Sequence, residues 1–136
     1  MTYEVCDILI ILFLHFVSDF ILQSRKMGQK KSKSLFWLSL HVFVYTTFLF
    51  WGWVCFVGFN DYSAYTIFGV YYMIWFSHFL TDFATSQFTT YAYVKSVEKD
   101  ISIRKRDRWQ YVFWAILGLD QFIHHLSLIL IYNYIS

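Results

Sequence analysis

The sequence predicts an all-α integral membrane protein, a four-helix bundle that forms a single domain over residues 1–136. The first observation is composition: 58% of the residues are hydrophobic, 24% are aromatic and only 15% are charged, unlike a soluble domain. The second is that all 11 Lys and Arg residues fall in two stretches, 25–33 and 95–108. The third is that each segment left between or outside them is long enough to span about 30 Å of hydrocarbon.

The predicted transmembrane helices cover residues of about 3–23, 34–57, 65–89 and 109–134. We expect the first to stay in the mature protein, because Glu4 and Asp7 replace the basic region of a cleavable signal peptide. The positive-inside rule makes the basic loops 24–34 and 91–108 cytoplasmic and both termini external. The sequence therefore predicts a multi-pass, N-out and C-out protein of the bacterial inner (cytoplasmic) membrane.

The connections between the helices carry weaker predictions. Residues 58–64 are rich in turn formers and contain no basic residue, as an outer loop would. The stretch 91–108 is expected to begin as an extension of the third helix and to lie along the membrane surface. Cys6 and Cys55 fall near the same ends of consecutive helices, so a disulfide is geometrically feasible, but two buried free thiols are favoured.

Three of the four helices carry a His and an Asp four residues apart, a spacing that places both on one helical face. The pairs and the lone histidine of the second helix give the candidate site, which consists of His15, Asp19, His41, His78, Asp82, Asp120 and His124. At about 1.5 Å per residue these positions lie ~6–23 Å from the cytoplasmic helix ends. We expect one inward-facing polar site in the cytoplasmic half of the bundle. His125 points about 100° away from His124 and is expected to be a neighbour at most.

Three carboxylates in membrane spans need neutralisation, since an ionised Asp in hydrocarbon costs at least ~2.5–3.5 kcal/mol. No Lys or Arg lies in the same spans, so the candidates are protons, imidazolium or a bound cation. Imidazole and carboxylate groups suit a divalent metal, Zn²⁺ first and Mn²⁺, Fe²⁺ or Ni²⁺ as alternatives, with all seven residues as ligands. Asp19, Asp82 and Asp120 are the candidate catalytic residues, because a non-ligating Asp can act as general base. The alternative is a purely structural hydrogen-bond network.

The same motifs carry a resemblance. The segments that carry it are His15-Phe-Val-Ser-Asp19-Phe-Ile-Leu-Gln23-Ser, Lys30, Leu40-His41-Val-Phe-Val-Tyr45-Thr, His78-Phe-Leu-Thr-Asp82 and Leu119-Asp120-Gln121-Phe-Ile-His124. Together they resemble a family of small bacterial and phage integral-membrane proteins catalogued as a domain of unknown function. The chain departs from it at Ser18, where Gly is expected, and at 25–27, where Asp-Trp-Met is more usual. The resemblance implies four membrane helices and no activity; a looser similarity links the His/Asp pattern to membrane-bound metal-dependent hydrolases.

The leading functional prediction is a metal-dependent membrane hydrolase acting on a lipid or a lipid-linked phosphate or ester. The second is metal-ion or proton transport or conduction, which would need a homo-oligomer because four unbroken helices are a small scaffold. The third is an accessory or phage-encoded protein that binds a host membrane protein. Membrane lipids are the expected partners, and nucleic acid is not, because the basic stretches are short and adjoin the membrane.

Overall fold

A computed structural model describes residues 2–58 and 62–135 of the chain. Its elements are α1 (Thr2–Phe16), the π-helical segment η1 (Val17–Ile21), α2 (Arg25–Lys30), α3 (Leu35–Phe56), α4 (Ala64–Ser96) and α5 (Ile103–Ile135). The described residues contain no strand, which confirms the all-helical prediction. The residues Asn60 and Asp61 of the predicted outer loop lie outside the described part.

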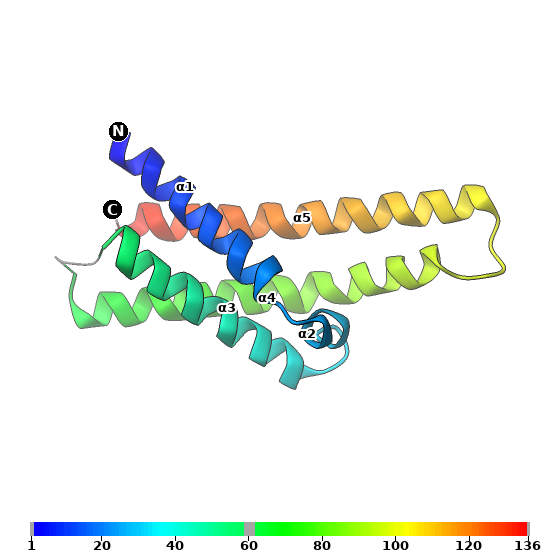
Figure 1. Cartoon of the computed structure of the whole chain (residues 1–136), viewed down its shortest axis with the longest axis horizontal. Coiled ribbons are helices and arrows are strands. Elements are labelled where there is room, and N and C mark those ends of the chain that lie inside the picture. Colours follow the sequence, from blue (N-terminus) through cyan, green and yellow to red (C-terminus); the bar gives the residue numbers. More distant parts are fainter. Residues whose placement is uncertain (1, 59–61, 136) are drawn as a thin grey trace.

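The structure differs from the predicted helix plan in two places. The basic loop 24–34 contains a fifth α-helix, α2, which begins where the Ser24 Oγ accepts a hydrogen bond from the Met27 N–H at 3.3 Å. The stretch 91–108 begins as an extension of the third predicted helix, as expected, because α4 continues to Ser96. Its remainder differs from the plan, since α5 already begins at Ile103 and the two helices form a long antiparallel hairpin (Figure 1).

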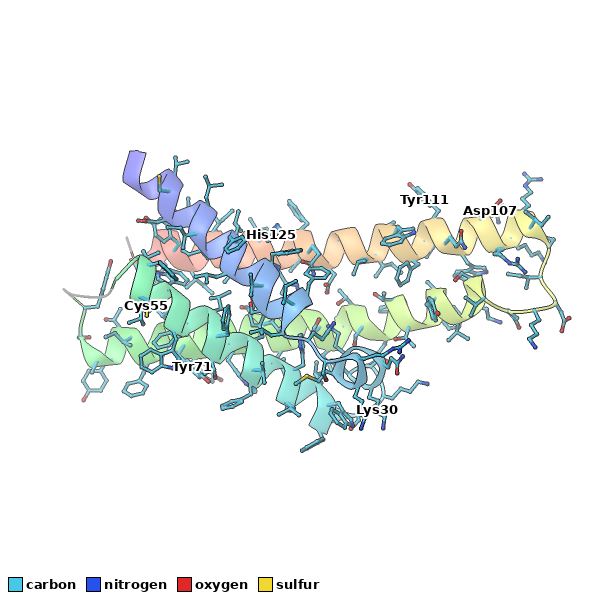
Figure 2. The ribbon with its side chains drawn as sticks, in the orientation of Figure 1. Lys30, Cys55, Tyr71, Asp107, Tyr111 and His125 are labelled. Atoms are coloured by element: carbon cyan, nitrogen blue, oxygen red, sulfur yellow. The ribbon has the colours of Figure 1, made fainter. Side chains whose placement is uncertain are left out.

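The hairpin of α4 and α5 is the frame on which the other elements pack. α3 contacts α4, and α1 contacts both α3, beside which it runs at a similar slope in this view, and α5, which it crosses obliquely (Figure 1). The beginning of α1 and the end of α5 lie at the same end of the molecule. At the other end the hairpin extends beyond α2 and carries Asp107 and Tyr111, whereas Lys30 projects from α2 (Figure 2). We call the first end the terminal end and the second the basic end.

The apolar core occupies the half of the bundle nearer the terminal end. Its buried members are Ile11, Leu14, Tyr45, Leu49, Phe50, Trp53, Val70, Ile74, Leu128, Ile131 and Tyr132. The close approach of α1 to α3 uses Gly52, where a Cβ atom would lie 2.6 Å from Leu14 Cδ2. This approach packs α1 against α3 as the chain enters the polar half at η1.

The outer surface is strongly apolar. Exposed large hydrophobic side chains outnumber the buried ones among the described residues. Two helices, α3 and α5, are long and apolar enough to cross a membrane. α1 is shorter because η1 follows it, and α4 carries polar residues along its buried face. Both cysteines are free, but they are exposed, so the prediction of buried thiols is wrong.

Candidate functional site

The first site residues stand at the junction of α1 and η1. The Ser18 hydroxyl donates to the carbonyls of Leu14 at 2.8 Å and His15 at 3.0 Å, supplying a donor where the hydrogen-bond pattern changes from α to π. Such π-helical turns are frequent at functional sites because they alter the direction of a side chain. Here Ser18 and Asp19 are both buried against the other helices. The Ser in place of the expected Gly therefore fits without loss of the site.

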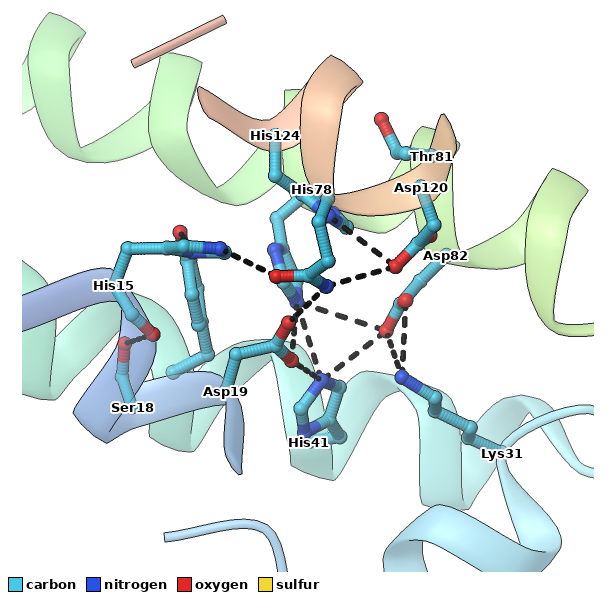
Figure 3. A network of polar contacts seen from close by, with 12 residues as sticks. His15, Ser18, Asp19, Lys31, His41, His78, Thr81, Asp82, Asp120 and His124 are labelled. Atoms are coloured by element: carbon cyan, nitrogen blue, oxygen red, sulfur yellow. Dashed lines mark hydrogen bonds and ion pairs between the residues drawn. The ribbon is translucent and has the colours of Figure 1, made fainter. Parts of the chain in front are cut away.

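Four side chains from three elements, η1, α3 and α4, converge on one point (Figure 3). His41 Nε2 lies 3.2 Å from Asp19 Oδ1, 3.1 Å from Asp82 Oδ2 and 3.1 Å from His78 Nε2. His78 Nε2 lies 3.6 Å from Asp82 Oδ2 and 3.9 Å from Asp19 Oδ1. A neutral imidazole nitrogen carries at most one proton, so His41 cannot satisfy three such neighbours by hydrogen bonding.

The pair on α5 extends this cluster. His124 Nδ1 lies 3.6 Å from Asp120 Oδ2, and the His124 ring lies 4.2 Å from the His78 ring between centroids. The Asp120 carboxylate also accepts a hydrogen bond from the Thr85 hydroxyl. Within the described part of the chain, neither His124 ring nitrogen nor His78 Nδ1 has a hydrogen-bond partner. Buried polar atoms without partners are uncommon, and these three nitrogens are therefore available to bind a ligand.

Six of the seven predicted residues can thus hold a metal ion. Three groups have ligand atoms all within 4.8 Å of one another: Asp19 with His41 and His78, His78 with Asp82 and His124, and Asp19 with Asp120 and His124. Because the groups share members, they form one compact site. The elongated site expected from helix depths is therefore more compact in the structure.

His15 lies beside the cluster and outside these groups. Its Nδ1 is 2.8 Å from the Tyr45 hydroxyl and its Nε2 is 3.0 Å from Gln121 Oε1. Since an amide oxygen only accepts, Nε2 donates to Gln121 and the neutral ring's Nδ1 accepts from Tyr45. The Gln121 amide group then donates to Asp19 Oδ2 and Asp120 Oδ2, both at 3.0 Å. In this arrangement one ring nitrogen of His15, predicted as a metal ligand, contacts Tyr45, and the other orients the amide that holds the two carboxylates.

Lys31 is the site residue that the sequence reasoning missed. It follows α2, and its ammonium group donates to both Asp82 oxygens, at 3.0 Å and 2.9 Å. Burial on its own would lower the pKa of Lys31, but the carboxylates of Asp82 and Asp19 outweigh this, so its pKa lies above the ordinary value. The three carboxylates therefore do have a lysine partner, supplied by the adjoining loop.

Tyr45 and Gln121 were also absent from the predicted site. Tyr45 is four residues after His41, so the same-face rule that paired the other residues could have found it. Its ring stacks on His78 with centroids 3.6 Å apart and planes 13° apart. Gln121 carried only the general signal of a polar residue in an apolar helix, and Lys31 carried none.

A cavity of about 490 Å³ adjoins the cluster. Asp19, Asp120 and Gln121 line it on the side of the site, and Lys31 lines it on the side of α2. A molecule in this cavity would meet two of the clustered carboxylates directly.

The chain belongs to the family described as "Protein of unknown function (DUF3307)", which matches residues 8–136. Neither the curated proteins nor the solved structures include a match to this chain. The family description assigns no activity, so the function has to be argued from the site.

Proposed function

We infer that this member of the DUF3307 family is an integral-membrane, metal-dependent hydrolase acting on a lipid or a lipid-linked phosphate or ester. The observation that carries the proposal is the set of separations among Asp19 Oδ1, His41 Nε2 and His78 Nε2, which are between 3.1 and 3.9 Å and belong to one group of possible ligands. Bonds of about 2.0–2.2 Å to Zn²⁺ give a tetrahedron with edges of about 3.3–3.6 Å. The three donor atoms therefore suit three corners of the tetrahedron around a divalent ion, and the fourth corner would be left for water or substrate.

Charge supports the same conclusion. The three carboxylates and the Lys31 ammonium leave two negative charges in a buried cluster. A buried charge without compensation costs several kcal/mol, so two of them need a counter-charge. One divalent cation with neutral imidazoles supplies it, and Zn²⁺ suits this donor set best, with Mn²⁺, Fe²⁺ or Ni²⁺ as alternatives. Two imidazolium groups would also balance the charge, but they could not bind a metal.

The distribution of side chains supports a membrane location. Polar groups are buried at the centre while apolar side chains such as Phe13, Phe76 and Phe122 are exposed outside, the reverse of a soluble bundle. The basic loop and the hairpin tip lie away from the terminal end, as the positive-inside rule requires of cytoplasmic segments. We propose four spans formed by α1 with η1, α3, α4 and α5, in the bacterial inner membrane with both termini outside.

Hydrolysis needs an activated water and a base beside the substrate. A bound divalent metal lowers the pKa of water and polarises a phosphoryl or carbonyl oxygen. We propose Asp120 as the general base. It lines the cavity, it is held by Thr85 and Gln121, and it is not one of the side chains that converge on His41. The water oxygen would bond to phosphorus or carbon as the ester P–O or C–O bond breaks. The water proton would pass through Asp120 to the departing alkoxide oxygen.

The apolar core favours hydrolysis over conduction by a single chain. Leu49, Val70 and Leu128 close the bundle between the polar site and the terminal end. The described residues therefore offer access to the site from the cavity side, which suits a substrate that enters and leaves by the same face.

Bound metal provides the direct test. The protein, purified in detergent without chelator, is analysed by elemental mass spectrometry beside His41→Ala and the matched carboxylate control Asp7→Asn. Asp7 accepts a hydrogen bond from Tyr132 at 3.0 Å, away from the cluster. We expect about one divalent ion per chain, lost in His41→Ala and kept in Asp7→Asn. A folded wild-type protein without metal would overturn the proposal. Transport, tested by liposome flux, and partner binding would then be the leading hypotheses.

A further inference from the structure

The cavity beside the cluster joins three kinds of surface. Its inner side is formed by the carboxylates of Asp19 and Asp120. Lys33, from the connection between α2 and α3, stands at its basic side, and Phe113 and Leu117 of α5 form an apolar wall. Cation, acid cluster and apolar wall lie within one space, an arrangement that suits an anionic amphiphile better than a wholly polar or wholly apolar ligand.

Gln23 adds an independent sign of a ligand. Its side chain lines the cavity, and its Oε1 is buried without a hydrogen-bond partner among the described residues. Gly28 of α2 approaches so closely that a Cβ atom there would lie 3.2 Å from Gln23 Nε2. An amide oxygen only accepts, so a buried Oε1 left unsatisfied beside a cavity is suited to a ligand group that donates to it, such as a hydroxyl.

The cavity also reaches the apolar exterior. Phe20 of η1 and Val94 of α4 line it and are at the same time exposed, at 44% and 52%. A hydrocarbon chain could therefore lie along the exposed helices while its headgroup occupies the cavity.

We propose that this cavity binds a lipid with a single phosphate headgroup. Lys33 contacts the phosphate, Gln23 Oε1 accepts a hydrogen bond from the P–OH group of the phosphate monoanion, and the first part of the hydrocarbon chain lies against Phe113 and Leu117. The phosphoester then faces Asp19 and Asp120. The assignment rests on the proposed function for its chemical meaning, but the binding site itself can be tested without turnover.

The test measures binding of dioleoyl phosphatidic acid to the full chain in detergent by native mass spectrometry. Dioleoylglycerol, with the same chains and no phosphate, and glycerol 3-phosphate, with the headgroup and no chains, are the comparison probes. We expect phosphatidic acid to bind saturably at about one molecule per chain and at least about tenfold more tightly than either probe, because a charge-assisted contact and an apolar contact are both required.

Three variants locate the site. Lys33→Gln should weaken phosphatidic acid binding about tenfold, and Leu117→Trp should do the same by filling the apolar wall. Lys99→Gln is the matched control, since Lys99 is an exposed lysine in the connection between α4 and α5. It should bind as the wild type does. Lys33→Gln and Leu117→Trp alter different sides of the cavity, so if one variant fails to fold, the other still tests the binding site.

Metal content, measured in the same preparations, separates this inference from the proposed function. Variants that keep their metal and lose the lipid support the cavity assignment. If the wild-type protein contained no metal but bound phosphatidic acid more tightly than Lys33→Gln, the hydrolase proposal would be overturned. The cavity assignment would still hold. Equal binding of dioleoylglycerol, equally tight binding of glycerol 3-phosphate, or equal loss in Lys33→Gln and Lys99→Gln would overturn the lipid phosphate site.

Discussion

The two halves of the bundle bury residues equally well but with opposite chemistry. On α4, the buried stripe at every fourth residue starts with Val70 and Ile74 and continues with His78 and Asp82, each at most 1% exposed. The buried stripes of the other helices change in the same way. The stripe of α1 and η1 consists of Ile11, His15 and Asp19. The stripe of α3 consists of Trp53, Leu49, Tyr45 and His41, and that of α5 consists of Tyr132, Leu128, His124 and Asp120. One helical face therefore serves both halves, and only the residue type changes along it.

The energetic consequences of the two halves differ. Burial of the apolar half is favourable through van der Waals packing, because lipid tails are as apolar as these side chains, and other well-packed apolar sets would serve it. Buried ionisable groups are at best neutral for stability unless each has a partner. The comparison indicates that the terminal half stabilises the fold, whereas under the proposed function the half beside α2 serves to bind the metal.

The largest expected effect on stability lies in the apolar half. Leu49→Ala removes a fully buried side chain and should lower the free energy of unfolding by about 2–5 kcal/mol, because a cavity remains. Denaturant titration in detergent measures this, and elemental analysis of the folded fraction should find the metal retained. If folded Leu49→Ala protein lost its metal together with its stability, the apolar half and the polar half would not be energetically independent.

A smaller effect is expected for His15, which contacts the cluster through Gln121. His15→Ala removes the group that orients Gln121 against Asp19 and Asp120, so metal affinity should fall about 10–100-fold. A competition titration with a chelating dye measures the affinity. The matched control is His125→Ala, which removes a ring that packs against His15 with centroids 4.8 Å apart and should change the affinity little. Complete loss of metal in His15→Ala would instead make His15 a ligand.

The smallest expected effect has the opposite sign. Lys31→Gln frees Asp82 and removes a positive charge next to the cluster, so affinity for a divalent cation should rise, by about tenfold, since water replaces part of the lost interaction. The control is Lys30→Gln, because Lys30 projects from the outer side of α2 over Trp37, 5.6 Å from the ring centroid. The same dye competition reports both. A fall in affinity would mean that Lys31 and Asp82 belong to a structural network.

Much of the fold and of the candidate site followed from local patterns. The four long apolar segments of the sequence correspond to α1 with η1, α3, α4 and α5. They could be predicted because the order of apolar and basic residues along the chain marks them. The His/Asp spacing identified six of the seven polar residues, and His41 was added as the lone histidine of the second helix; all seven are buried. The short helix α2 and the length of the hairpin were missed, since both depend on packing against other elements more than on local preference.

What the sequence by itself determined is the set of faces: which residues of each helix point inward, and that the inward face changes from apolar to polar along its length. Helical periodicity is a property of neighbouring residues, so it needs no tertiary contact. Only the tertiary structure decided the roles within the polar half. Rotation and crossing of the helices turned His15 toward Tyr45 and Gln121 and away from the shared centre. The fold also placed the flexible side chain of Lys31 on Asp82, 51 residues away in the chain. Such contacts arise from how elements meet in space, which no local pattern records.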